Sequence, residues 1–184
     1  MIGRAFVAVE PPAATLDAVQ AIVDRVAPSA PDLRWLPREQ WHITLQFLGA
    51  VADEDALVER LAAALAPLTA PTVALAGGGA FPKVARGGVL WLAVADGADA
   101  LADVARAVHD ATAALGHETE DRPFRPHLTV ARARRPRDHR GLVDAIGAAT
   151  VGSPWTVTEV VLYESDTRPE GAVHHERARI AVGA

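Results

Sequence analysis

Two histidines each stand two residues before a threonine, in four-residue segments of the same pattern. The segments are His42-Ile43-Thr44-Leu45 and His127-Leu128-Thr129-Val130. With seven His and eleven Thr in 184 residues, chance supplies about 0.4 His-x-Thr pairs. Alternate side chains of a β-strand point to the same face. Each His should therefore share a face with its Thr, while the apolar neighbours, and Phe47 further along the first strand, should point into the core.

Paired imidazoles on facing strands suit acid–base chemistry. The ordinary pKa of histidine is about 6.5, so near neutral pH one ring can be neutral and the other protonated. The neutral ring can take a proton from a nucleophile while the charged ring protonates a leaving group. Threonine hydroxyls beside them can donate hydrogen bonds to an anionic oxygen. The pattern predicts phosphoryl transfer to water without a metal, in which positioning and charge stabilisation do most of the catalysis.

An arginine-rich run surrounds the second segment. Residues 121–140 contain seven Arg and two acidic residues, a local charge of +5 in a chain whose net charge is −5. Such a run is often a solvated loop, but it can also form an anion site. Arg125 and Arg132 flank His127, which favours the anion site. Strict alternation would place Arg132 on the core face, so we expect it to lie at the end of the strand, where twist or a bulge can re-aim it.

Hydrophobic spacing predicts an α+β chain without a linker. Strands are expected at residues 4–10, 33–36, 42–49, 72–76, 88–94, 127–131, 156–164 and 173–182. Helices are expected at 13–27, after an Asp53 N-cap, after an Asp99 N-cap and at 140–148. Gly77-Gly78-Gly79 should form a bulge or hairpin corner. The order helix, extended piece, His-containing strand occurs twice, which indicates two similar lobes within one domain at residues 1–184.

Composition excludes several classes of site and of protein. The absence of Cys excludes a thiol nucleophile, a disulfide framework and an iron–sulfur cluster. The apolar runs are too short to span a membrane, and the N-terminus lacks a signal-peptide layout, so we expect a cytoplasmic monomer. Five further histidines lack metal-ligand spacing and are predicted to lie on the surface: His109, His117, His139, His174 and His175. Five aromatic residues could stack a base but are predicted mainly as core: Phe6, Trp41, Phe47, Phe81 and Trp91.

The chain resembles the two-histidine (2H) phosphoesterase superfamily, and within it the RNA 2′,3′-cyclic phosphodiesterases, also called 2′-5′ RNA ligases. The resemblance rests on residues 4–9, on residues 41–49 and 124–132 around the two motifs, and on Leu162-Tyr163-Glu164-Ser165 followed by Pro169-Glu170-Gly171. One departure lies after that last glycine. Family members often carry an aromatic residue there, and this chain has His174 and His175.

The resemblance implies a two-lobed α+β fold, with two antiparallel sheets and outer helices around a central cleft, and a pseudo-twofold axis. It implies metal-independent hydrolysis of the 2′,3′-cyclic phosphate at an RNA end to a 2′-phosphate, with no cofactor and with 2′-5′ ligation as a weak side activity. His42 would be the acid and His127 the base. Thr44, Thr129 and Arg132 would bind the substrate. Arg125, which flanks His127, is also expected to bind it.

Two other functions remain open. The chain could be a 2H enzyme that acts on 2′-5′ oligonucleotides or small cyclic nucleotide phosphates. It could also be a nucleotide- or RNA-binding module that kept the cleft without turnover.

Overall fold

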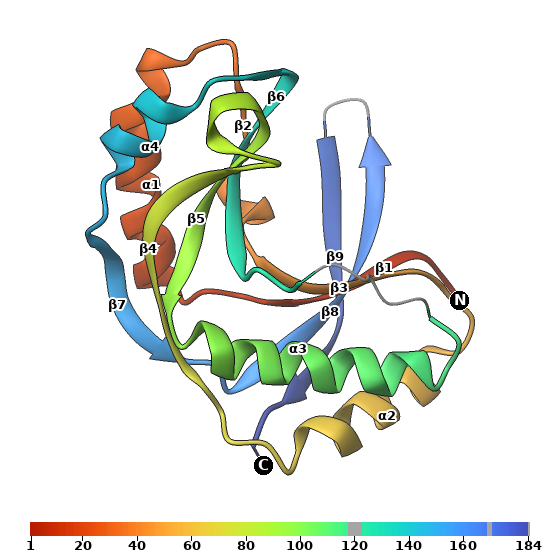
Figure 1. Ribbon diagram of the computed structural model, residues 1–184. Helices are drawn as coiled ribbons and strands as arrows, with labels where there is room; N and C mark the ends of the chain where they lie inside the picture. The colour runs from red at the N-terminus through yellow and green to blue at the C-terminus, as the bar shows by residue number, and fades with distance from the viewer. Residues whose placement is uncertain (118–122, 169–170, 184) are drawn as a thin grey trace.

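The computed structural model describes residues 1–117, 123–168 and 171–183, and within these ranges nine strands form one hydrogen-bonded sheet (Figure 1). The strands are β1 (Ile2–Val9), β2 (Arg34–Trp35), β3 (Ile43–Val51), β4 (Thr72–Phe81), β5 (Gly87–Asp96), β6 (His127–Arg137), β7 (Thr150–Thr156), β8 (Glu159–Arg168) and β9 (Gly171–Ala181). The α-helices in the same ranges are α1 (Ala13–Val26), α2 (Glu54–Leu65), α3 (Ala98–Ala113) and α4 (Arg140–Ile146), and short 3₁₀ turns are η1 (Ala27–Ser29), η2 (Arg38–Gln40) and η3 (Val84–Arg86).

A single residue pair connects the two sides of the sheet. The strand order is β7-β4-β5-β6-β3-β1-β8-β9, with β2 also paired to β6, and neighbouring strands are antiparallel. Between β3 and β6 the register consists of Ile43 opposite Leu128. The resemblance implied two antiparallel sheets, but among the described residues this junction joins all the strands into one. We call β7-β4-β5-β6 with β2 the His127 half, and β3-β1-β8-β9 the His42 half.

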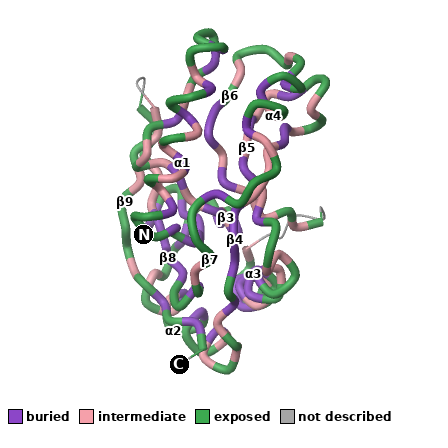
Figure 2. The backbone as a smooth tube through the Cα atoms, turned by 90° about the vertical axis from the view of Figure 1, so that its left-hand side faces the viewer, coloured by how far each residue is buried: buried purple, intermediate pink, exposed green. Residues whose placement is uncertain are grey.

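Two helices pack against each half. Helices α1 and α4 contact β7 and β4 of the His127 half, whereas α2 and α3 contact β9 and β3 of the His42 half (Figure 1). Helix α1 thus crosses from β1 to the opposite half, and α3 crosses back from β5. Neither half is therefore a continuous segment of the chain. Buried segments follow the central strands and the inner helix faces (Figure 2).

Local chemistry explains where two helices begin. Asp53 caps α2 as predicted, because its side chain accepts a hydrogen bond from the backbone N–H of Ala56 at 3.0 Å. Asp99 instead lies in the first turn of α3, and Gly97 precedes that helix with φ 72°. A Cβ on Gly97 would meet the Thr72 carbonyl oxygen at 2.1 Å. Glycine is required there by both the left-handed backbone and the close contact.

The glycine-rich stretch lies inside a strand. Gly77 has φ 71° at a register shift between β4 and β5, which confirms the predicted bulge. The hairpin corner itself comes later, at η3. A Cβ on Gly79 would lie 2.1 Å from the Trp91 ring, so the absence of a side chain makes room for that indole. The sequence also concealed β7, because Gly152 and Pro154 interrupt its strand pattern and are tolerated at the edge of the sheet.

Three histidines outside the motifs hold segments together. His139 was predicted on the surface but is 1% exposed, and its Nε2–H donates to the Gly87 carbonyl at 2.9 Å. His109 donates to the Leu45 carbonyl and His117 to the Leu48 carbonyl, each at 3.1 Å. Helix α3 and the turn after it are thereby attached to β3. In the part of the chain that the structure describes, no helix is long and apolar enough to cross a membrane.

Candidate active site

The junction between β3 and β6 positions the motif residues. Ile43 and Leu128 are fully buried on the core side. His42 immediately precedes β3, and the side chains flanking the junction turn to the opposite face, as alternation requires. Four of these side chains line one cleft of about 800 Å³, namely His42, Thr44, His127 and Thr129. The structure thus brings together the four residues that the sequence selected.

A β-bulge turns Phe47 into the cleft. Val7 pairs with Gln46 and Ala8 with Thr44, so β3 carries one extra residue at Leu45. Leu45 and Gln46 are both buried, and Phe47 emerges on the cleft face with 62% of its surface exposed. The prediction that Phe47 faces the core is therefore wrong. Apolar spacing alone could not reveal the bulge.

Helix α3 satisfies the polar groups that the bulge displaces. Bulges disturb the backbone ladder, and buried polar groups need partners. His109 donates to the carbonyl of Leu45, the extra residue. The Thr112 hydroxyl donates to the Gln46 side-chain oxygen at 2.7 Å, where both residues are buried. These contacts stabilise the strand geometry that exposes Phe47.

A second bulge re-aims Arg132, as expected. Leu90 pairs with Ala131 and Trp91 with Thr129, which leaves Val130 as the extra residue of β6. Val130 and Ala131 are both buried, and Arg132 returns to the cleft. The prediction that Arg132 lies at the strand end is wrong, because β6 continues to Arg137. Each motif histidine is therefore followed five residues later by a bulge-directed cleft residue, Phe47 in one half and Arg132 in the other.

Positive charge gathers in this cleft although the chain is acidic. Among the described residues that line it there is no Asp or Glu, and there are four Arg: Arg4, Arg34, Arg132 and Arg168. Arg34 stands directly opposite Arg132 in the β2–β6 pairing, and neither forms an ion pair within the described chain. Like charges opposite one another are destabilising. This arrangement is therefore suited to a bound anion.

Three of these arginines were not predicted. Arg4, Arg34 and Arg168 come from β1, β2 and β8, and long-range strand pairing brings them to the motifs. Arg125, which was predicted to bind substrate, is not among the described residues that line the cleft. The structure instead uses its backbone carbonyl. Pro169 and Glu170 of the expected closing segment lie outside the described residues.

His127 has a defined tautomer. Its Nδ1 lies 2.6 Å from the Arg125 carbonyl oxygen. A carbonyl can only accept, so Nδ1 carries the proton and the neutral ring keeps its lone pair on Nε2. Burial lowers the pKa of His127, and the hydrogen bond to Arg125 opposes that effect. The ring also contacts Phe81 edge-to-face at 4.8 Å. His127 is accordingly suited to accept a proton near neutral pH.

His42 is more strongly biased toward the neutral form. Burial, followed by the charge of His174, lowers the pKa of His42 to about 4. A backbone hydrogen bond to Gln40 opposes this, while His127 and Arg132 add to it. A bound anion would reverse the balance, because negative charge nearby favours the imidazolium. If His42 is the acid, its proton must be stabilised by the bound substrate.

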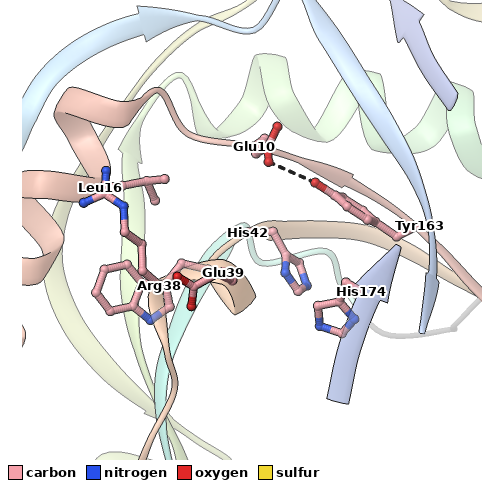
Figure 3. A pocket seen from close by; sticks show the side chains of 8 residues that line it. Glu10, Leu16, Arg38, Glu39, His42, Tyr163 and His174 are labelled. Atoms are coloured by element: carbon pink, nitrogen blue, oxygen red, sulfur yellow. Dashed lines mark hydrogen bonds between the residues drawn. The ribbon is translucent and has the colours of Figure 1, made fainter. Parts of the chain in front are cut away.

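A third histidine, missed by sequence reasoning, contacts His42 (Figure 3). His174 on β9 was predicted on the surface, but it lines the cleft and also a second cavity of about 170 Å³. Glu10 and Tyr163 line that second cavity, and the Tyr163 hydroxyl donates to Glu10 at 3.1 Å. His175 is exposed, as predicted. The signal for His174 in the sequence was the departure from the family's aromatic residue.

Two further observations bear on ligands. Among the described residues, no group of three or more His, Asp or Glu side chains is arranged to hold a metal ion. Of the aromatic residues predicted as core, Phe6 and Trp41 are buried, whereas Phe81 lines the cleft beside His127.

Comparison with known families and sequences gives consistent matches. Residues 7–169 match the 2′-5′ RNA ligase superfamily. A protein of Aeropyrum pernix named RNA 2′,3′-cyclic phosphodiesterase is 31% identical over 82% of this chain and 87% of its own length. A Geobacillus stearothermophilus protein of the same name is 33% identical over 88% of this chain. The match spans 52% of that longer protein, so this chain covers about half of its length.

Solved structures share the fold. The crystal structure of TT0787 of Thermus thermophilus is 29% identical, with a TM-score of 0.74 and coverage of 97% of each chain. Escherichia coli LigT complexed with 3′-AMP is 24% identical, with a TM-score of 0.76 over 99% of each chain. The latter likeness, at this identity, shows the α+β fold alone.

Proposed function

Because this chain belongs to the 2′-5′ RNA ligase superfamily, we propose that it hydrolyses a 2′,3′-cyclic phosphate at an RNA end to a 2′-phosphate. One observation carries the proposal. Two His-x-Thr motifs meet on one cleft, together with four arginines and without a carboxylate among the described lining residues. That arrangement suits a compact phosphate anion whose hydrolysis takes one proton from water and gives another to the leaving oxygen.

The reaction assigns each histidine one proton transfer. Water attacks phosphorus, and its proton passes to the lone pair on Nε2 of His127. The bond between phosphorus and the 3′-oxygen breaks, and His42 protonates that oxygen. The 2′-phosphate remains, and the two rings have exchanged protonation states. A proton must then move from His127 to solvent and another must reach His42 before the next turnover.

Hydroxyl and guanidinium groups would hold the phosphate in line. Thr44 and Thr129 would donate to its non-bridging oxygens, where each hydrogen bond to a charged group is worth about 1.5–3 kcal/mol. Arg132 would stabilise the charge that develops in the transition state, with Arg34 beside it. No step needs a metal ion or a cofactor.

An exposed aromatic ring favours a nucleotide as the substrate. Phe47 stands on the cleft wall within 5.9 Å of Phe6 and presents a free ring face. Stacking of a base on an aromatic side chain is worth about 1–3 kcal/mol. The relatives named RNA 2′,3′-cyclic phosphodiesterase support the same substrate class.

Product analysis tests this proposal. The protein is incubated with EDTA and 2′,3′-cyclic mononucleotides, cyclic-ended oligonucleotides or a 2′-5′-linked dinucleotide, with His42→Ala and His127→Ala as controls. We expect 2′-phosphates from the cyclic substrates, made by the unaltered protein alone. A 3′-phosphate product, turnover by both variants, or activity that requires added Mg²⁺ or Mn²⁺ would contradict the proposal.

A further inference from the structure

We propose that His174 is a positioning residue for His42, which fixes the orientation of the His42 ring and competes with it for one proton. This inference rests on the proposed function, because His42 is the acid of that reaction. His174 acts through His42 and does not itself contact the reacting atoms.

Ring geometry supports the positioning role. The centroids of His174 and His42 lie 5.3 Å apart at an interplanar angle of 85°, an edge-to-face contact. Phe6 contacts both rings, at 4.9 Å from His174 and 4.8 Å from His42. The three rings therefore restrict one another. Rotation of His42 away from the cleft would break its contacts with Phe6 and His174.

The ring nitrogen of His174 supports the proton competition. Its Nδ1 is buried and finds no hydrogen-bond partner among the described residues. Burial, followed by the charge of His175, lowers the pKa of His174, and no hydrogen bond at Nδ1 within the described chain opposes this. Two imidazolium rings at this separation repel each other, so a proton on His174 disfavours a proton on His42. The charge of His174 is, after burial, the main influence that lowers the pKa of His42.

The two rings line both the arginine-rich cleft and the small cavity. Two carboxylates and Arg38 line the small cavity (Figure 3). Charged and titratable groups face the pair from five places: Glu10 after β1, Arg38 and Glu39 in η2, Tyr163 in β8, His127 and Arg132 in β6, and His175 in β9. Arg132 and His127 disfavour a proton on His42, and His175 disfavours a proton on His174.

The neighbouring histidine supplies a matched control. His175 lies on the same strand but is exposed, and its Nε2 lies 3.1 Å from an Asp166 carboxylate oxygen. Replacement of His174 by Phe keeps an aromatic ring against His42 and removes the proton. Replacement of His175 by Phe removes a proton from the same strand without changing the ring cluster.

The test measures the titration of His42 directly by NMR. The full chain is labelled at histidine, and the His42 signal is identified by its loss in His42→Gln. In His174→Phe the midpoint of His42 should rise by on the order of one pH unit, because a repelling charge is removed. The limb of the pH–kcat/KM profile that reports His42 should move upward with it. In His175→Phe neither should rise, because loss of the His175 charge lets His174 hold its proton more readily and so cannot favour a proton on His42.

Further variants separate positioning from loss of the fold. His174→Ala should lower kcat by roughly tenfold or more with little change in KM, because the His42 ring is no longer held. His174→Phe and His174→Tyr should recover most of that loss. An unmoved His42 midpoint in both aromatic variants, or an equal rise in His175→Phe, would overturn the inference. If the midpoint shifts as expected but the unaltered protein hydrolyses no cyclic phosphate, the ring pair stands and the proposed function fails.

Discussion

Binding of an anion in the cleft should draw a proton onto His42. The pKa of His42 is about 4 in the free protein, mainly through burial and the charge of His174. A unit negative charge at about 4 Å contributes about 4 kcal/mol at an effective dielectric constant of 20, which corresponds to about three pKa units. The pKa of His42 in the complex should therefore lie near 7.

The sign follows from linkage. An anion that raises the pKa of His42 binds more tightly as the pH falls, because protonation of His42 and anion binding favour each other. Between about pH 7 and pH 4 the affinity should rise by up to about tenfold per pH unit. At a pH midway between the free and bound pKa values, close to one proton should be taken up per anion bound.

Calorimetry measures this uptake. Sulfate is the suitable ligand, because it does not itself titrate in this range, and titrations in buffers of different ionisation enthalpy give the number of protons. His42→Gln is the control and should lose most of the uptake while keeping the arginines. If the unaltered protein takes up no proton, or if His42→Gln takes up as many, then the cleft anion does not raise the pKa of His42 and the reasoning is wrong.

Three other predictions concern the base, the RNA strand and stability. Phe47→Ala should weaken binding of cyclic mononucleotides by about 1–3 kcal/mol relative to Phe47→Tyr, measured as KM, while a base-free ribose cyclic phosphate should bind both variants equally. Replacement of the exposed Arg134 and Arg135 by Ala should make the slope of log K against log [salt] for oligonucleotide binding shallower by about 0.7 per lost phosphate contact. Mononucleotide binding should stay unchanged. His42 takes up a proton below about pH 6.5 in the unfolded state but only below about pH 4 in the native state. The free energy of unfolding should therefore decrease as the pH falls between those values, by at most ~3 kcal/mol from this residue. Urea unfolding of His42→Gln should show a correspondingly flatter decline over this window, and an unchanged slope would contradict the assigned pKa.

The motif side chains were predictable because alternation is a short-range property. A strand that buries Ile43 must present His42 and Thr44 on its other face, and the same holds around Leu128. The re-aiming of Arg132 was also predictable, since an unpaired arginine cannot be left on the core face. Phe47 carries no such constraint. An apolar ring is acceptable on either face, so its pattern concealed the bulge at Leu45.

The remaining features depend on contacts between distant segments. Arg34 reaches the site because β2 pairs with β6, and its two-residue strand has no periodicity to read. His174 and His175 are adjacent, and which of them faces inward depends on the pairing of β9 with β8. The joining of both halves into one sheet depends on the pair Ile43–Leu128, which no local sequence pattern predicts. Arg137 pairs with Asp32, which is likewise far from it in the sequence.

The division of labour between His42 and His127 is the central claim, and an activated leaving group tests it most directly. A nitrophenyl phosphodiester leaves without protonation, so it no longer needs an acid but still needs a base. On a cyclic phosphate, His42→Ala and His127→Ala should each lose roughly 10²–10⁴-fold in turnover. On the nitrophenyl substrate, His42→Ala should recover much of its activity and His127→Ala should remain slow. Recovery of His127→Ala alone would reverse the two roles, and recovery of neither would contradict paired acid–base catalysis at this site.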